Sequence, residues 1–106
     1  MKIFQDTHNA LHSASIDTSR FLSARLRAET RASGWPEEVT RHMRVSYSPD
    51  GFNVHSHPSH EALAHNLEYG TPDDRPTAAI RRFSNRTKEA ETFFLGRFAH
   101  HMAGGR

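Results

Sequence analysis

The fold is decided by the stretch VTRHMRVSYSPDGFNVH, residues 39–55, in which apolar and polar side chains alternate on both sides of a turn. Alternation with a period of two is typical of a strand with one buried face. The sequence Ser48-Pro49-Asp50-Gly51 suits a reversal, because proline fits the first central position of a turn and glycine tolerates a positive φ. The stretch therefore predicts a β-hairpin whose first strand runs from Val39 to Tyr47. Its apolar face would carry Met43, Val45, Tyr47, Phe52 and Val54.

A helix is predicted before the hairpin, from about His8 to Arg31. Apolar positions recur there at helical spacing, and Asp6-Thr7 offers an N-cap. The sequence Ser33-Gly34-Trp35-Pro36 would end this helix, since glycine permits a left-handed C-cap and proline cannot continue a helix. Trp35 is expected to fold over the helix end and close a small core.

Two further helical segments are predicted after the hairpin. Residues 61–67 fit one or two helical turns that end at Gly70. The polar loop 73–77 would place Pro76 in the first turn of the last helix, where a missing N–H group costs nothing. That last helix is predicted as one unbroken element from about Thr77 to Met102, which would be ~39 Å long at about 1.5 Å per residue.

The last helix carries the strongest amphipathic pattern of the chain. Its apolar face comprises Ile80, Phe83, Thr87, Ala90, Phe94, Phe98 and Met102. A helix of this length extends beyond what one small sheet can cover. We therefore expect its distal half, with Phe94, Phe98 and Met102, to form a subunit interface. Gly96 is expected to mark a kink or a close approach of another helix.

These elements together predict an α+β fold in one domain spanning residues 1–106. A small antiparallel β-sheet would be packed by the N-terminal helix and the long C-terminal helix. A chain of this size can bury only about 65% of the surface that its unfolded form exposes. The core is therefore expected to be small, with neighbouring chains completing part of it.

The composition excludes several classes of protein. The 106 residues include no cysteine, which rules out disulfides, thiolate zinc sites and thiol nucleophiles. Hydrophobic residues make up 35% of the chain, below the roughly 45% of an average domain. The formal net charge of +2 is too small for a generally basic, nucleic-acid-binding surface. No apolar run approaches a membrane span or a signal peptide, so a soluble protein without an export signal is expected.

The most conspicuous polar feature is the run His55-Ser56-His57-Pro58-Ser59-His60. Two histidines two residues apart on a strand share a face, and imidazoles suit zinc, nickel or copper. The spacing is similar to the HxHxDH motif of metallo-β-lactamase-type hydrolases, but Ser59 stands in place of the aspartate, and the chain is too short for the two sheets of that fold. We therefore expect His55, His57 and His60 to lie on the exposed face and at the end of the hairpin, and we predict no metal or cofactor.

Basic residues concentrate around the last helix, at Arg75, Arg81, Arg82, Arg86, Lys88 and Arg97. Such a patch could contact phosphates. Acidic residues are interleaved with it, which favours ion pairs within or between subunits. Neither a nucleophile elbow nor a phosphate-binding glycine loop is present, and the chain is not expected to be an enzyme.

One motif lies between the hairpin and the last helix. The sequence Leu67-Glu68-Tyr69-Gly70-Thr71, followed by Arg75-Pro76-Thr77 and a long helix, resembles the minor tail component family of long-tailed bacteriophages. In that family a hairpin leads into a segment ending in (Val or Leu)-Glu-(Phe or Tyr)-Gly-Thr, then a loop with proline and a terminal helix. The usual Pro-Phe-Leu of the last helix is here Pro76-Thr77-Ala78-Ala79-Ile80. Within this motif Gly70 is expected to adopt a backbone conformation that a residue with Cβ resists, Tyr69 to pack, and Glu68 to bond to backbone or a basic group.

The resemblance implies a structural subunit of the phage neck or tail: a head–tail connector, tail-completion or tail-terminator protein. Such a protein forms a ring with itself, commonly of six subunits, between head-closure, stopper or connector proteins and the tail tube protein. DNA would only pass through the lumen, and no membrane is involved. The expected location is the virion neck or tail, after assembly in the host cytoplasm.

Two alternatives remain from the residues alone. The first is a small metal-dependent enzyme that uses His55, His57 and His60. The second is a DNA-binding accessory protein that uses the arginines of the last helix.

Overall fold

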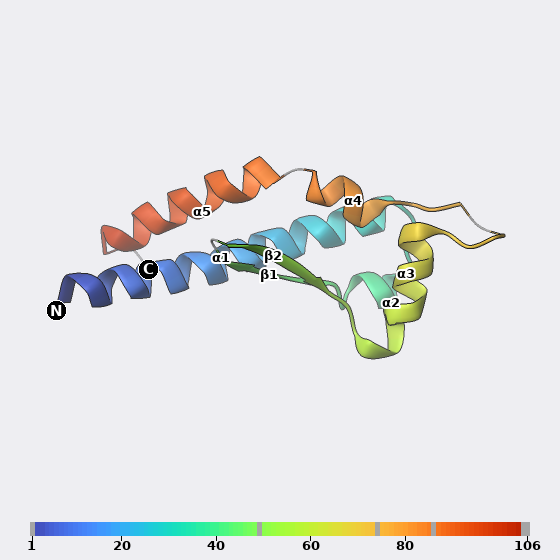
Figure 1. The fold of residues 1–106 in the computed structure, drawn as a ribbon, viewed down its shortest axis with the longest axis horizontal. Helices are drawn as coiled ribbons and strands as arrows, with labels where there is room; N and C mark the ends of the chain where they lie inside the picture. The colour runs from blue at the N-terminus through green and yellow to red at the C-terminus, as the bar shows by residue number, and fades with distance from the viewer. Residues whose placement is uncertain (1, 49, 74, 86, 105–106) are drawn as a thin grey trace.

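The computed structural model describes residues 2–48, 50–73, 75–85 and 87–104, and it has the expected α+β architecture (Figure 1). A long N-terminal helix lies beside a two-stranded antiparallel sheet, and helices follow at the C-terminal end. The elements in order are α1 (Lys2–Ala32), α2 (Glu37–Thr40), β1 (Arg44–Ser48), β2 (Gly51–His55), the 3-10 turn η1 (Pro58–His60), α3 (Glu61–Tyr69), α4 (Ala79–Ser84) and α5 (Thr87–Met102).

The predicted hairpin is confirmed, but its first strand is shorter than predicted. Strands β1 and β2 pair in the register Val45↔Val54, with Ser48↔Gly51 next to the turn. Val39 lies in α2 and is fully buried, so the prediction of a strand beginning there was wrong. Two glutamates in the first turn of α2 favour a helix N-terminus at this point. Pro49, assigned to the turn, lies outside the described residues.

A row of side chains on α1 bonds the free edge of β1. The hydroxyl Oγ of Ser23 accepts the Val45 N–H at 2.9 Å, and that of Ser19 accepts the Tyr47 N–H at 2.9 Å. One turn further along α1, Arg27 Nη1 donates to the Met43 carbonyl at 3.0 Å. We call Ser19, Ser23 and Arg27 the α1 ladder. It gives the edge strand the partners that a third strand would otherwise supply.

Helix α1 ends as predicted but begins earlier. The N–H of Gly34 bonds to Arg31 O and that of Trp35 to Thr30 O, with Gly34 at φ 84°, which is the Schellman pattern of a helix end. Trp35 is buried beyond it, as expected. Residues 6–7 lie inside α1, so the N-cap predicted there was wrong. The first half of α1 is helical because α5 packs against it.

The last helix is broken, in contrast to the prediction of one continuous helix. Helix α4 ends at Ser84 and α5 begins at Thr87. The break allows Phe83 of α4 to meet Phe52 of β2 edge to face, with ring centroids 5.7 Å apart, while α5 lies along α1. Pro76 precedes α4 by three residues instead of lying in its first turn. Gly96 is exposed on α5, and the described part of the chain brings no other helix close to it, so the close approach expected there is not found.

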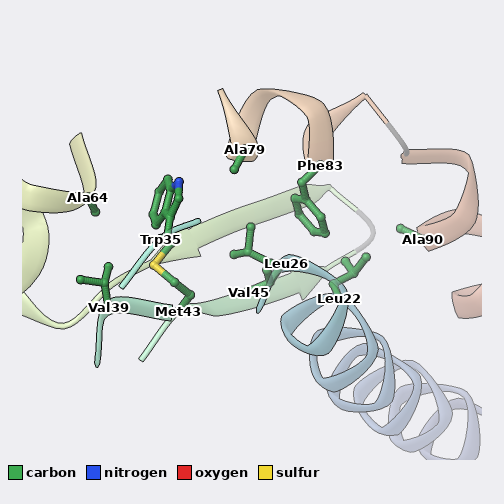
Figure 2. Packing of buried hydrophobic residues seen from close by; sticks show 10 residues of the cluster. All are labelled: Leu22, Leu26, Trp35, Val39, Met43, Val45, Ala64, Ala79, Phe83 and Ala90. Carbon is green, nitrogen blue, oxygen red and sulfur yellow. The ribbon is translucent and has the colours of Figure 1, made fainter. Parts of the chain in front are cut away.

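The core forms where the second half of α1 meets the hairpin and α4 (Figure 2). Figure 2 shows Leu22 and Leu26 of α1 beside Val45, with Phe83 above them. Trp35, Val39 and Met43 close the other end of this core. The paired ends of α1 and α5 extend beyond it, and the molecule measures 59 × 25 × 21 Å.

The α1 ladder predicts the effect of Ser23→Ala. Removing the hydroxyl leaves the buried Val45 N–H without an acceptor, a loss of about 1–3 kcal/mol that the better helix propensity of alanine offsets only in small part. We expect the free energy of unfolding, measured by urea titration with circular dichroism, to fall by about 1–2 kcal/mol.

Ser15→Ala is the matched control, because Ser15 lies on the same helix and its hydroxyl has no partner among the described residues. It should change the unfolding free energy by less than about 0.5 kcal/mol. Equal effects of the two substitutions would contradict a stabilising role for the ladder.

Candidate functional site

Glu68 of the predicted family motif is the only charged side chain that is buried in the described part of the chain, at 4% exposed. Its Oε2 accepts the N–H of Ile80 at 2.8 Å, and its Oε1 accepts that of Arg81 at 2.9 Å. Both N–H groups belong to the first turn of α4, where backbone donors have no partner within the helix. The carboxylate therefore caps α4 with two charge-assisted bonds, and its negative charge suits the helix N-terminus.

The rest of the motif forms a clasp around this cap. The backbone N–H of Thr77 donates to Leu67 O at 2.9 Å, and the Thr77 hydroxyl donates to the same oxygen at 2.7 Å. The indole N–H of Trp35 then donates to the Thr77 hydroxyl at 2.7 Å. Gly70 ends α3 at φ 82° and ψ 175°, a region that residues with Cβ avoid. We call Leu67, Glu68, Gly70 and Thr77 the Glu68 clasp.

The motif residues divide into those the structure uses and those it leaves at the surface. The expected bonding of Glu68 to backbone is confirmed, as is the special conformation of Gly70. Tyr69 was predicted to pack, and this was wrong: it is 63% exposed, with its ring near that of His65. Thr71 is half-buried and Pro76 is exposed. The motif thus acts mainly through its glutamate and glycine, which join α3 to α4.

The histidines that meet in the structure differ from the set His55, His57 and His60 of the metal hypothesis; His55 and His57 are exposed, as expected, and His60 is half-buried. The rings of His57 and His60 meet that of His42, with centroids 5.2 to 5.7 Å apart. His55 lies apart from them and hydrogen-bonds Ser46 Oγ at 2.8 Å. His42 was not singled out as a candidate, because it comes from the turn before β1 and only the fold brings it to η1.

The histidine cluster does not form a metal-binding arrangement in the structure. Among residues 2–48, 50–73, 75–85 and 87–104, no three histidine, aspartate or glutamate side chains are placed to hold a metal ion. Nδ1 of His57 accepts the Ser59 N–H and lies 2.7 Å from its hydroxyl, while Nδ1 of His60 is buried without a hydrogen-bond partner. Burial, followed by the charges of Arg41, His57, His60 and Arg44, lowers the pKa of His42. The arginine charges would also oppose a bound cation.

Some basic residues of the C-terminal helices form ion pairs with carboxylates of α1. Arg82 Nε bonds Glu29 at 2.9 Å, and Arg97 Nε bonds Asp17 at 2.9 Å, so both tie their helix to α1. His101 Nε2 also contacts Asp17, at 2.7 Å. Ion pairs within the subunit, one of the two expected kinds, are present for Arg82 and Arg97, but their carboxylates come from α1 and not from the acidic residues interleaved with the patch. Arg86 lies outside the described residues.

The predicted interface residues take different positions on α5. Phe94 is buried within the chain, with its ring 5.4 Å from that of Tyr47. Phe98 is half-buried, and Met102 is 43% exposed. Leu95, which the sequence reasoning missed, is 62% exposed. Residues 95, 98 and 102 follow the spacing of three and four that places side chains on one helix face, and we call them the α5 stripe.

No family model matches the chain, and neither the curated proteins nor the solved structures contain a match to it. Of the helices the structure describes, none combines the length and apolar character needed to cross a bilayer.

Glu68→Gln should destabilise the protein. The amide retains one acceptor oxygen but turns an N–H group toward the second backbone donor, so one buried N–H of α4 loses its partner. We expect the unfolding free energy to fall by about 1–3 kcal/mol in urea titration. Glu91→Gln, which changes an exposed carboxylate beyond the first turn of α5, is the control and should change stability by less than about 0.5 kcal/mol. A Glu68→Gln protein as stable as this control would contradict the capping role.

The lowered pKa of His42 predicts a loss of stability in mild acid. The unfolded chain takes up this proton at the ordinary pKa, above that of the folded state, so stability decreases as the pH falls below about 6.5. We expect the decrease in melting temperature between about pH 7.5 and pH 5.5 to be smaller in His42→Gln than in the wild type. His12→Gln, an exposed histidine of α1, should retain the wild-type dependence. Identical pH profiles for the wild type and His42→Gln would disprove the role assigned to His42.

Proposed function

We propose that the chain is a structural subunit of a bacteriophage neck or tail ring, as a head–tail connector, tail-completion or tail-terminator protein. The resemblance of the motif at residues 67–71 suggests this role. The order of a helix, a hairpin, a short helix that ends at Gly70 and a C-terminal helical region is compatible with it.

The observation that carries the proposal is how far the chain departs from a compact monomer. Its radius of gyration is 16.2 Å, whereas a compact chain of this length has about 13 Å. Its accessible surface is 7150 Å², against roughly 6000 Å² for a monomer of 12.1 kDa. A thin, extended subunit of this kind gains most from neighbours that cover its sides.

The exposed α5 stripe is the surface we assign to such a neighbour. Leu95 and Met102 are large apolar side chains that are exposed to water, and both belong to α5. Helix α5 runs along the first half of α1, and together they form an arm that extends beyond the core (Figure 1). Apolar side chains of this kind are typical of the centre of a subunit interface, with charged groups around them. In a closed ring each subunit would present this stripe to a different surface of the next subunit.

In this proposal the Glu68 clasp positions the helices that carry the contact surface. It determines where α4 begins, and α4 leads directly into α5. The ion pairs of Arg82 and Arg97 with α1 then set the position of the arm. The motif would thus position the contact surface without itself touching the neighbour. The subunit would act by stacking between head-closure or connector proteins and the tail tube, around the lumen through which DNA passes.

The two alternative functions gain less from the structure. In the described chain the histidines of the metal hypothesis provide no ligand set. Arg82 and Arg97, from the basic patch around the last helix, are already engaged with carboxylates.

Assembly of the purified protein tests the proposal. Light scattering across a concentration series and negative-stain imaging, alone and with phage tails or necks, should show rings or incorporation into these particles. Leu95→Gln/Met102→Gln should weaken assembly at least about tenfold, since burying one such side chain contributes about 1.5–3 kcal/mol.

Leu63→Gln is the control, because Leu63 has a similar exposure of 40% but lies on α3. All variants should retain the melting temperature of the wild type within a few degrees. A wild-type chain that is strictly monomeric and never joins a tail or neck would overturn the proposal. Equal assembly of the double variant and the control would overturn the assignment of the α5 stripe.

A further inference from the structure

Four arginines gather on the side of the molecule where α1 runs along the edge of β1. They are Arg20 and Arg27 of α1, Arg41 after α2, and Arg44 at the start of β1. With Ser19, Ser23 and Val45 they line an open groove of about 460 Å³. We call this the arginine groove. It is separate from the basic patch that the sequence places around the last helix.

The arginines of the groove have no acidic partners in the part of the chain that the structure describes. Other arginines of α1 do have them: Arg25 pairs with Glu89, and Arg31 with Glu37. Glu37 is an acidic residue whose pKa is affected by an arginine of the groove. Its pKa is lowered mainly by hydrogen bonds from Arg31, and the charge of Arg41 lowers it further to a smaller extent. Its carboxylate is already paired with Arg31, so the four positive charges lie together without a counterion among the described residues.

The fold holds two of these guanidinium groups close together. Arg27 Nη1 and Arg44 Nη1 both donate to the carbonyl oxygen of Met43, at 3.0 and 3.1 Å. Arg44 Nη1 also donates to Arg41 O at 2.9 Å. Burial, with the charges of Arg44 and Arg31, lowers the pKa of Arg27. Bringing like charges together costs free energy in the free chain, and an anion in the groove would recover it. The remaining N–H groups of both guanidiniums are available to that anion.

The lining of the groove indicates what kind of anion fits. Val45 is its one apolar lining residue and is only 4% exposed, so the groove offers no apolar anchor of the kind that protein interfaces use. Arg20 and Arg27 are two helical turns apart, about 10 Å along α1. A row of phosphates spans that distance and offers a separate anionic group to each arginine. Guanidinium groups bind phosphate oxygens in a bidentate manner and are common in contacts to nucleic-acid backbones.

We propose that the arginine groove binds the phosphodiester backbone of a nucleic acid, without reading its bases. The inference goes beyond the ring function and does not depend on it, because it rests on unpaired charge and groove shape alone. The contact would be local, in keeping with the formal net charge of +2.

Fluorescence anisotropy with a labelled DNA duplex of about 20 base pairs tests the proposal across a salt series, since each phosphate contact adds about −0.9 to the slope of log K against log salt. We expect wild-type binding at low salt with a slope between about −2 and −4. Arg20→Gln/Arg41→Gln should weaken binding about tenfold or more and reduce the magnitude of the slope by about 2. Both side chains are exposed, and neither forms a hydrogen bond or a salt bridge among the described residues, so the fold should persist.

Arg75→Gln/Arg81→Gln is the matched control. It removes the same charge from two exposed arginines outside the groove and should change affinity less than about twofold. An RNA duplex of equal length, run in parallel, shows which sugar the groove accepts, and groove-dependent binding of either duplex supports the proposal. No duplex binding by the wild type, or equal weakening in both double variants, would overturn it. Groove-dependent binding of polyglutamate but of neither duplex would also overturn it, in favour of an acidic protein partner.

Discussion

The rest of the structure depends on the bonds between α1 and the edge of β1. A two-stranded hairpin is marginally stable by itself, and its free edge exposes backbone donors. Residues four apart on a helix advance about 6 Å, and residues two apart on a strand about 6.7 Å, so the two rows match closely. Ser19 and Ser23 can therefore bond Tyr47 and Val45 in register. Each hydroxyl also donates its single proton to a carbonyl one turn back, so it both donates and accepts a hydrogen bond.

This constraint also explains why charge accumulates at one place on the surface. Arg27 continues the spacing of the two serines and bonds Met43 O, and Arg44 approaches the same oxygen from the strand. The bonds that hold the hairpin to α1 thus also position the walls of the arginine groove. At the start of α4, the Glu68 clasp holds the first helical turn, and α4 packs against α1. Polar contacts that stabilise the fold therefore also position the two proposed surfaces: the α1 ladder positions the arginine groove, and the Glu68 clasp positions α4, which leads to the α5 stripe.

Structural features that depend on neighbouring residues could be predicted from the sequence, whereas features that depend on residues far apart in the chain could not. The hairpin turn and the helix ends at Gly34 and Gly70 follow from glycine conformations within a few residues, and these predictions are confirmed. A bond from Glu68 to backbone could also be predicted, but its partners lie twelve and thirteen residues away and only the structure identifies them. The exposure of Tyr69 could not be predicted, because aromatic character alone does not show which side of a short helix is covered.

The sequence by itself determined an α+β chain with one hairpin, a long first helix and a small core, since alternation, helical spacing and breaker residues act over short distances. Tertiary structure alone decided that β1 starts at Arg44, that α4 and α5 separate, and that four arginines share a groove. Each of these outcomes depends on residues far apart in the chain. The packing of Phe83 onto Phe52 outweighs the continuity of the last helix. The bonds between α1 and the segment that leads into β1 bring together arginines that lie too far apart in the sequence for a local pattern to relate them.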